Sequence, residues 1–496
     1  MNSPVEHDFD VVVVGGGPGG STLSALVAMQ GHRVVLLEKE QFPRYQIGES
    51  LLPSTIHGIC RILGVADELA RVGFTLKRGG TFKWGSNPNP WTFAFAISPR
   101  FAGPTSYAYQ VERMKFDNIL LNNARRVGVD VHERCSVVDV IVDNERVCGA
   151  TYDDPHGERR AIRARFVVDA SGNKSRIYSY VGGARHYSKF FKNLALFGYF
   201  EGGKRLPEPN AGNILTVAFE DGWFWYIPLS ERLTSVGAVV NRDMAYKVQG
   251  DTEQALLELI GSCPLIRDYL CNAQRATYAP YDQLRVRKDY SYCQSTFWRP
   301  GMVLIGDAAC FVDPVFSSGV HLATYSAFLA ARSVNSCLAG SMDEKRSFRE
   351  FEARYRREYG RFYEFIMAFY DMHQSEQSYF WKAKKVTKCE ASELEAFVEL
   401  VGGLSSWESA FSGTDSVTAR FMAASEELAV AAERVTGNKD EHSNPLLDSK
   451  IVGTVLEEGA QLQVRALMGK ETGQEAPLFP DGLVPSHDGM RWVVPQ

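Results

Sequence analysis

A glycine-rich turn near the start of the chain has the spacing of a nucleotide-binding loop. The stretch "VVVVGGGPGGSTLSALV" fits the pattern G-x-G-x-x-G with Gly15, Gly17 and Gly20, and Gly19 lies inside it. Glycines let the backbone turn sharply and approach a pyrophosphate, which then lies against free N–H groups at the start of the next helix. Glu38, 18 residues after Gly20, stands where an acid binds a ribose hydroxyl, and Lys39 follows it. These residues predict an adenine-dinucleotide site.

A second turn, "IGDAAC", follows an apolar stretch at residues 302–305. The pairing of an early glycine turn with a late Gly-Asp turn resembles the FAD-dependent aromatic hydroxylases and their relatives, and "VVDASG" and "QVERMKFDNIL" match two more motifs of that group. The resemblance implies that Asp307 faces the ribityl and phosphate part of FAD and that Arg113 contacts the flavin. No second G-x-G-x-x-G follows a strand, so we expect no separate nicotinamide domain.

The elements that would hold these turns are a strand at 11–14, a helix at 21–30 closed by Gly31, and a strand at 34–37. Continuous apolar runs are typical of parallel strands that are buried on both faces. Residues 185–285 instead alternate apolar and polar, which predicts an antiparallel sheet. We expect "RGGTFKWG" (78–85) and "TSYAYQV" (105–111) to add strands to it.

The predicted fold class is therefore α/β, with a Rossmann-like FAD-binding domain, an inserted antiparallel β-sheet substrate domain of the aromatic-hydroxylase kind, and a mainly helical C-terminal domain. We place the FAD-binding domain at 1–340, its β-sheet subdomain at roughly 185–285, and the helical domain with an extended tail at 341–496. The tail includes "GNKDEHSNP" and "GQEAPLFPDGLVPSHDG", whose glycine, proline and charge predict extended chain rather than core.

The stretch "GWFWYIP" at 222–228 places Trp223 and Trp225 on one face of a strand and Phe224 and Tyr226 on the other. By itself this pattern fits a packed core strand. Trp-x-Trp-x-Ile-Pro, however, resembles the signature of flavin-dependent halogenases. A hydroxylase must bring its substrate within about 3–3.5 Å of the reacting oxygen. A wall of indoles would prevent that contact and pass only a small oxidant such as hypochlorous acid, formed from chloride and a flavin hydroperoxide.

The same resemblance implies two further sites. Lys77, in "GFTLKRGGTFKW", matches the lysine that this family places beyond the wall, where its ammonium would hold hypochlorous acid or its free amine would form a chloramine. Burial would lower the lysine pKa toward the second form. Backbone N–H groups around Ser318 and Gly319, in "DPVFSSGVHLA", predict a halide and flavin site at a helix start. Tryptophan-type halogenases have a glutamate in this stretch; its absence here favours a phenol or pyrrole substrate.

The subfamily that the sequence resembles is that of the glycopeptide-antibiotic halogenases, on "FPRYQIGESLLP", "NLALFGYFEGGKRLPEP", "GWFWYIPLS" and "FVDPVFSSGVHLATYSA". It implies an FADH₂-dependent enzyme that chlorinates tyrosine or β-hydroxytyrosine on a peptidyl carrier protein of a nonribosomal peptide synthetase. A separate flavin reductase would supply the reduced FAD. An FAD/NADPH aromatic hydroxylase and a non-catalytic scaffold are the alternatives. Tyr226, His321 and several later tyrosines stay open as groups that activate the phenol.

Composition limits the other classes. The formal net charge is −5, which argues against nucleic acid or an anionic membrane as partner. Nine cysteines without a C-x-x-C pair favour reduced thiols in a cytoplasm and no metal site. No apolar run approaches the roughly 18 residues that span a bilayer.

Overall fold

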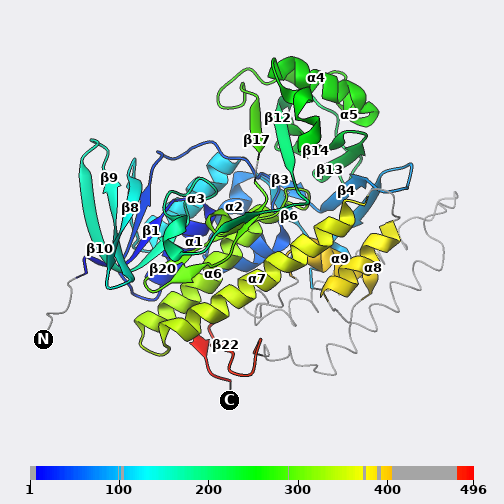
Figure 1. Ribbon diagram of the computed structural model, residues 1–496. Helices are drawn as coiled ribbons and strands as arrows, with labels where there is room; N and C mark the ends of the chain where they lie inside the picture. Colours follow the sequence, from blue (N-terminus) through cyan, green and yellow to red (C-terminus); the bar gives the residue numbers. More distant parts are fainter. Residues whose placement is uncertain are drawn as a thin grey trace, which may run out of the picture.

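The computed structural model describes residues 7–98, 100–101, 105–288, 290–371, 376–387, 392–404 and 477–495. Its first large sheet has the order β19-β20-β10-β1-β2-β7, and β9 and β8 extend it beside the long strand β10 (Figure 1). The strands are β1 Phe9–Val14, β2 Val34–Glu38, β7 Asp130–Glu133, β8 Ser136–Asp143, β9 Arg146–Asp153, β10 Arg159–Asp169, β19 Trp298–Arg299 and β20 Met302–Leu304.

The centre of this sheet is parallel, as predicted. Strand β1 pairs in parallel with β2 and β10, so that Val13 lies between Leu36 and Val168. Helix α1 (Pro18–Ala28) begins three residues before the predicted start because Pro18, which has no N–H to leave unpaired, suits the first turn. Gly31 has φ +85° but lies three residues past the helix end, so it belongs to the following turn rather than to the cap.

The second large sheet has the order β16-β12-β15-β14-β13-β4-β5, and β17 also pairs with β12. Its strands are β4 Gly79–Lys83, β5 Trp91–Ala94, β12 Asn193–Glu201, β13 Ile214–Phe219, β14 Gly222–Pro228, β15 Leu233–Asn241, β16 Gln274–Arg275 and β17 Arg285–Lys288. Figure 1 shows α4 (Thr252–Ser262) and α5 (Pro264–Tyr269) covering one side of it. The predicted antiparallel sheet is therefore present, and residues 79–94 belong to it.

One predicted strand joins a different sheet. Strand β6 (Ala108–Gln110) pairs with β3 (Thr75–Lys77) and forms one isolated bridge with Ser50, and it does not join the large antiparallel sheet. The reason lies in the next residues: Arg78 N and Gly79 N both donate to the side-chain Oδ1 of Asn213, each at 2.9 Å. The pairing of the chain changes at this contact. Strand β3, which ends just before Arg78, pairs with β6, and strand β4, which begins at Gly79, pairs with β13. The prediction for 105–111 was wrong in this respect.

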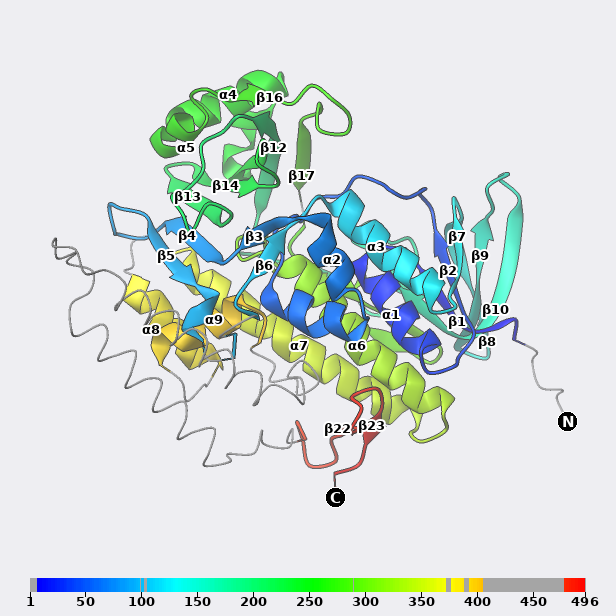
Figure 2. The same ribbon diagram turned by 180° about the vertical axis from the view of Figure 1, so that it is seen from behind.

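Long helices cross the face of the first sheet. Helix α6 (Ser318–Leu338) packs against α1 and α7 (Glu344–Phe369), and Figure 2 shows α2 (Ala66–Val72) and α3 (Arg113–Arg126) on the same side as α1. Helices α8 (Glu376–Thr387) and α9 (Glu393–Val401) lie beside β5, whose Trp91 ring contacts Phe380 and Phe397 (Figure 2). The end of α7 and α9 share one hydrophobic core with β1 and β14. The domain division at residue 340 stays a prediction.

The last described segment is packed, which corrects part of the predicted extended tail. Strands β22 (Val484–Pro485) and β23 (Trp492–Val493) form a hairpin against α6, and the Trp492 side chain is 1 % exposed. Its indole Nε1 donates to Ser333 Oγ at 2.8 Å, and the Arg332 guanidinium lies 4.6 Å from its ring centroid. A buried aromatic anchor thus outweighs the glycine and proline around it. The stretch at 437–445 lies outside the described residues.

The smaller elements complete the frame of the site. Strands β11 (Arg185–Tyr187), β18 (Tyr292–Gln294) and β21 (Cys310–Phe311) form a separate three-stranded sheet. Within the described ranges, no helix is both long and apolar enough to cross a membrane.

Candidate active site

A cavity of about 580 Å³ runs from the glycine turn to the aromatic strand β14. Its wall contains eight of the nine predicted cofactor residues: Gly15, Gly17, Gly19, Glu38, Lys39, Arg113, Asp307 and Gly319. The exception is Gly20. The structure therefore brings together residues that lie up to 304 positions apart in the chain (Gly15 and Gly319).

The glycines of the turn do different work. A Cβ on Gly20 would lie 1.9 Å from the carbonyl oxygen of Gly15, so Gly20 is needed for the close packing of α1 on the strand end. Gly15 has φ +102°, a conformation that L side chains rarely adopt. A Cβ on Gly17 would meet only Arg44, at 3.5 Å, so its open side faces the cavity. Gly17 is thus the glycine that leaves room for a ligand, whereas a Cβ on Gly19 would lie 3.2 Å from the Ala323 carbonyl oxygen of α6.

Glu38 braces the turn at the opposite end of the cavity from β14. Its Oε2 accepts a hydrogen bond from Gly16 N at 2.6 Å, and its Oε1 accepts one from Glu40 N at 2.8 Å. The side chain is 4 % exposed. Its contact with a ribose hydroxyl stays a prediction, and the neighbouring Lys39 also lines the cavity.

Arg113 positions the chain segment that covers the cavity. Its guanidinium binds the Asp117 carboxylate in a bidentate pair at 2.8 and 2.9 Å, and Nη1 donates to Ile47 O at 2.6 Å. The bond to Ile47 holds residues 46–50, which line the cavity, in place. Burial raises the pKa of Asp307 to about 6, against the opposing charges of Arg113 and Arg185.

Three buried polar atoms in the cavity wall have no hydrogen-bond partner among the described residues: Glu49 Oε2, Ser50 Oγ and Tyr290 OH. An unpaired buried polar group destabilises a protein unless a ligand or water satisfies it. Together with the open glycine turn at the other end of the cavity, these atoms fit a dinucleotide such as FAD. The two hydroxyls can donate to the flavin end of the dinucleotide, and the carboxylate oxygen can accept from it. Burial raises the pKa of Glu49 to about 7, while a hydrogen bond from Tyr199 OH to Oε1, at 2.7 Å, opposes that rise.

Glu49 and Ser50 were missed as site residues in the sequence analysis. Glu49 stands between Gly48 and Ser50 in "QIGESLLP", and no local pattern there marks either residue as part of a site.

Trp223 and Trp225 close the cavity at its flavin end. Both line it, with ring centroids 6.2 Å apart, and both belong to the core cluster that contains Ile227. Phe224 and Tyr226 belong to the separate cluster on the other face of the sheet. The predicted division of the two faces is confirmed.

Lys77 is buried and does not line the cavity. It ends strand β3, is 3 % exposed, and donates from Nζ to Leu51 O at 3.0 Å; the Nζ also lies 5.7 Å from the ring centroid of Phe95. Leu51 directly follows Glu49 and Ser50 of the cavity wall. Burial lowers the pKa of Lys77 to about 7. A solvated surface lysine is therefore excluded, and near neutral pH the amine and the ammonium are both present.

The start of α6 meets the cavity at Gly319. Ser318 is fully buried, and its Oγ has no partner in the described part of the chain. The residue before it, Ser317, has φ +60°, and a Cβ on Gly319 would lie 2.9 Å from the Phe311 ring. The free N–H groups of this 21-residue helix begin there. The arrangement suits an anion, and halide binding by Ser318 and Gly319 stays a prediction.

Comparison with known proteins identifies this constellation. Residues 10–103 and 98–435 match the family described as tryptophan halogenase. The chain belongs to this family. It is a flavin-dependent halogenase that acts on an aromatic substrate.

Individual relatives agree with this assignment. The halogenase is 50% identical to the myxobacterial chondrochloren halogenase CndH, described as a new variant of FAD-dependent halogenases, with a TM-score of 0.75 and coverage of 98% of this chain and 100% of that one. It is 36% identical to tryptophan 2-halogenase of Chondromyces crocatus over 380 residues, 76% of this chain and 70% of the relative. It is 34% identical to the flavin-dependent halogenase gsfI of Penicillium aethiopicum, over 73% of this chain and 71% of the relative.

Tyr226 and His321, which were considered as activators of a phenol, lie outside the cofactor cavity of the halogenase. Tyr226 points to the far face of the sheet and donates to Lys204 O at 2.8 Å. His321 is 1 % exposed, with Nδ1 at 2.9 Å from Ser54 Oγ and Nε2 at 3.0 Å from Glu358 Oε1. Both ring nitrogens are occupied, and a Cβ on Gly403 would lie within 3.0 Å of the ring. Neither residue faces the cofactor cavity.

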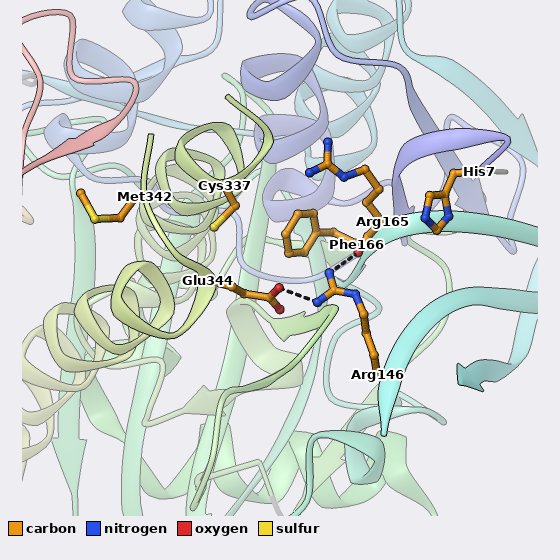
Figure 3. A pocket seen from close by; sticks show the side chains of 7 residues that line it. All are labelled: His7, Arg146, Arg165, Phe166, Cys337, Met342 and Glu344. Atoms are coloured by element: carbon orange, nitrogen blue, oxygen red, sulfur yellow. Dashed lines mark hydrogen bonds and ion pairs between the residues drawn. The ribbon is translucent and has the colours of Figure 1, made fainter. Parts of the chain in front are cut away.

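A second cavity of the halogenase, of about 350 Å³, lies away from this site (Figure 3). Its seven lining residues share none with the larger cavity. Figure 3 shows Arg146 and Glu344 facing each other, with a distance of 2.5 Å between Nη1 and Oε2. Glu344 also accepts a hydrogen bond from Gly301 N at 2.6 Å. These bonds fix the start of α7 to the first sheet.

Proposed function

We propose that this halogenase chlorinates the phenol ring of tyrosine or β-hydroxytyrosine carried on a peptidyl carrier protein, as in glycopeptide-antibiotic assembly, with Lys77 as the group that delivers chlorine. The observation that carries the proposal is the burial of Lys77 close behind the cofactor cavity, with a pKa of about 7. A lysine that is free of its proton at neutral pH is a nucleophile.

The chemistry at Lys77 balances simply. Bound reduced FAD with O₂ supplies the two oxidising equivalents that convert chloride to hypochlorous acid. The Lys77 amine attacks the chlorine of hypochlorous acid, so that an N–Cl bond forms, the O–Cl bond breaks, and water leaves with the amine proton. The phenol ring then takes the chlorine, and its ring proton returns to the amine. The opposite assignment, a Lys77 ammonium that hydrogen-bonds hypochlorous acid, uses the protonated form instead.

The tryptophan wall keeps these two halves of the reaction apart. Trp223 and Trp225 occupy the position from which an organic substrate would otherwise reach the flavin. Removal of water from this region also prolongs the life of reactive species. Chloride would be held at Ser318 and Gly319, where a buried hydroxyl without a partner and the N–H groups of α6 coincide.

The substrate class rests on two opposing observations. The stretch Phe316-Ser317-Ser318 has no glutamate, which favours an electron-rich phenol, and Phe316 packs on Phe369 rather than facing the cavity. The tryptophan 2-halogenase relative at 36% identity favours an indole. The carrier protein and the separate flavin reductase are supported by the resemblance of four sequence stretches and by the presence of one glycine turn of the dinucleotide type.

The test is mass spectrometry of four substrates, each with chloride, FAD and an added flavin reductase: carrier-bound tyrosine, carrier-bound β-hydroxytyrosine, free tyrosine and free tryptophan. We expect a mass gain of one chlorine for hydrogen on the carrier-bound phenols only. Chlorination of free tryptophan alone would replace the phenol proposal by the indole one. Equal chlorination of free tyrosine would remove the carrier from the proposal.

The pH dependence separates the two roles of Lys77. If the free amine reacts, the chlorination step gains rate as pH rises through about 7, up to tenfold per pH unit below the pKa. If the ammonium holds hypochlorous acid, the rate falls over the same range. We expect the rise, measured in single turnovers with pre-reduced enzyme.

A further inference from the structure

The end of helix α7 reaches the tryptophan wall. Tyr370 directly follows α7, and its hydroxyl accepts a hydrogen bond from Trp223 Nε1 at 2.8 Å. Trp223 is 1 % exposed, so this indole N–H has no access to solvent water. Trp225 differs: its Nε1 donates to Ser235 Oγ on the adjacent strand, at 3.2 Å. Only the first of the two indoles is thus held from outside its own sheet.

The hydrogen bonds of the Tyr370 hydroxyl are fully determined. It accepts from Trp223 and from Asn193 Nδ2, at 3.1 Å, and both of those atoms can only donate. Its own proton is therefore directed to Asp313 Oδ2, at 2.9 Å. The other carboxyl oxygen of Asp313 accepts from Val315 N at 3.0 Å. Val315 N, Tyr370 OH and Asn193 Nδ2 all donate to Asp313, so its carboxyl serves as an acceptor here.

Asp313 occupies an unfavourable place for a carboxyl. It is fully buried, and no basic side chain lies within ion-pair distance of it in the described part of the chain. Burial raises its pKa to about 7, and the donors from Val315, Tyr370 and Asn193 oppose that rise. A buried carboxyl without a cation destabilises a fold. Its position therefore calls for a role other than stability.

That role follows from where Asp313 sits. It begins the loop 313–317 that leads into α6, and Pro314, Ser317 and Gly319 of this segment line the cofactor cavity. One carboxyl oxygen shapes this loop, and the other holds Tyr370. We propose that Asp313 and Tyr370 are positioning residues that lock the Trp223 indole in register with the loop 314–319, so that the wall and the halide side of the cavity keep one fixed spacing. The proposal rests on halogenation itself and not on which aromatic substrate is chlorinated.

A simple packing role makes a different prediction. The Tyr370 ring also contacts Phe191 and Trp84, with centroids 5.3 and 5.8 Å away. Tyr370→Phe keeps the ring and removes only the hydroxyl, so it leaves the Trp223 N–H unpaired and takes from Asp313 Oδ2 the nearer of its two donors, with Asn193 Nδ2 remaining at 3.4 Å. Asp313→Asn keeps the shape of the side chain but replaces a carboxyl oxygen by an NH₂ group, which turns a donor toward the proton of the Tyr370 hydroxyl. If packing alone matters, both variants behave as the parent enzyme.

The matched control is Tyr363→Phe. Tyr363 lies on the same helix, its ring also contacts Phe191 with centroids 5.3 Å apart, and its hydroxyl bonds Ser188 Oγ at 3.0 Å. It has no contact with Trp223 and does not line the cavity. This substitution removes a hydroxyl of the same kind from the same helix.

The experiment measures hydrogen peroxide released per reduced FAD consumed, with and without chloride and with no organic substrate. In the parent enzyme and in Tyr363→Phe, chloride should suppress peroxide release severalfold because it captures the oxidising equivalents. In Tyr370→Phe and Asp313→Asn, the suppression should shrink to less than twofold while FAD content stays unchanged. The double variant should be no worse than the worse single one, because both residues act through one hydrogen bond.

A second readout follows the indole directly. Difference ultraviolet resonance Raman spectra against Trp223→Phe isolate the one indole among the eight tryptophans. Its N–H band should move to the position of an unbonded indole in Tyr370→Phe only. Normal chloride suppression of peroxide in Tyr370→Phe and Asp313→Asn would overturn the proposal. So would an equal loss in Tyr363→Phe, or a loss of FAD with no change in the Trp223 band.

Discussion

The two faces of strand β14 are equally aromatic and equally buried, yet they serve different ends. On one face Trp223 and Trp225 line the cofactor cavity, and each indole N–H is bonded to a hydroxyl. On the other face Phe224 and Tyr226 pack in the separate cluster with residues of α4 and α5 such as Leu256. The first face shares its cavity with residues that have unpaired buried polar atoms. The second has the ordinary composition of a core.

The difference separates residues that stabilise the fold from residues that serve the reaction. Residues of the α4–α5 face bury apolar surface, which stabilises the fold. In the cavity wall, Glu49 and Asp307 have pKa values displaced by burial toward the neutral form, and so has Lys77, which is buried outside the wall against Leu51 O. Groups of this kind reduce stability and cluster at sites of reaction. Substitutions on the two faces should therefore move different measurements.

Lys77→Ala should have the largest effect. If Lys77 carries the chlorine, chlorinated product falls by at least ~10³-fold, as expected for a group that acts only in the chemical step. FAD content and peroxide release should stay as in the parent, because Lys77 does not line the cavity. Lys77→Arg should restore little, since a guanidinium stays protonated. Substantial product from the alanine variant would remove Lys77 from the mechanism.

Trp223→Ala should come next. The loss of an indole opens space for water beside the flavin, so product per reduced FAD should fall by about tenfold while FAD is retained. Mass spectrometry of product and an assay of peroxide on the same sample give the ratio. A variant with the parent ratio would show that the wall has no part in directing the oxidant.

Phe224→Ala breaks the comparison from the other side. Phe224 is the neighbour of Trp223 in the chain. Its replacement by alanine should lower the free energy of unfolding by about 3–5 kcal/mol, the range for a buried phenylalanine. The folded enzyme should keep the parent ratio of product to reduced FAD. Urea unfolding at low temperature and the product assay on the folded fraction check both halves. A fall in that ratio equal to the one caused by Trp223→Ala would make the two faces equivalent.

The smallest effect, and the sharpest in sign, is a gain in stability from Lys77→Met. The folded pKa of Lys77 is about 7, below the ordinary 10.5, so below pH 7 its burial carries the full penalty. Between about 7 and 10.5 the unfolded chain binds more protons, and stability rises with pH. The shift corresponds to roughly 5 kcal/mol as an upper bound. Lys77→Met should therefore raise Tm by a few degrees at pH 7 while product is lost.

That gain should shrink as pH rises above 7 and vanish only above about 10.5, where the amine is neutral in both states. Calorimetry at pH 7 and pH 9.5 is the measurement. A lower Tm at pH 7 would mean that the hydrogen bond to Leu51 O outweighs the burial of the charge.

Local patterns were enough to predict the parallel strands, the glycine turn and the two faces of β14, because each depends on residues within a few positions. The predicted roles of Lys77 and Ser318 came from family resemblance; what the structure adds is their burial, which depends on β3, Leu51 and the start of α6. The Asp313–Tyr370 pair was not predictable: the two residues lie 57 positions apart, and no local pattern marks a tyrosine hydroxyl that accepts from an indole.

Two misjudged segments have the same cause. The pairing of β6 with β3 depends on the side chain of Asn213, more than a hundred residues away. The packed C-terminal hairpin depends on Trp492 meeting Arg332 and Ser333 on α6. In both cases one distant polar or aromatic side chain decides against a local tendency.

The position of β1 in the middle of its sheet has a consequence for synthesis on the ribosome. β1 is the first strand to emerge, but its neighbour β10 ends at Asp169 and β20 ends at Leu304. At about 5–20 residues per second, the valines of β1 wait roughly ten seconds or more for the strands that cover them. The hairpin that seals α6 arrives last of all. We therefore expect newly made chains to depend on chaperones until Trp492 has left the ribosomal tunnel.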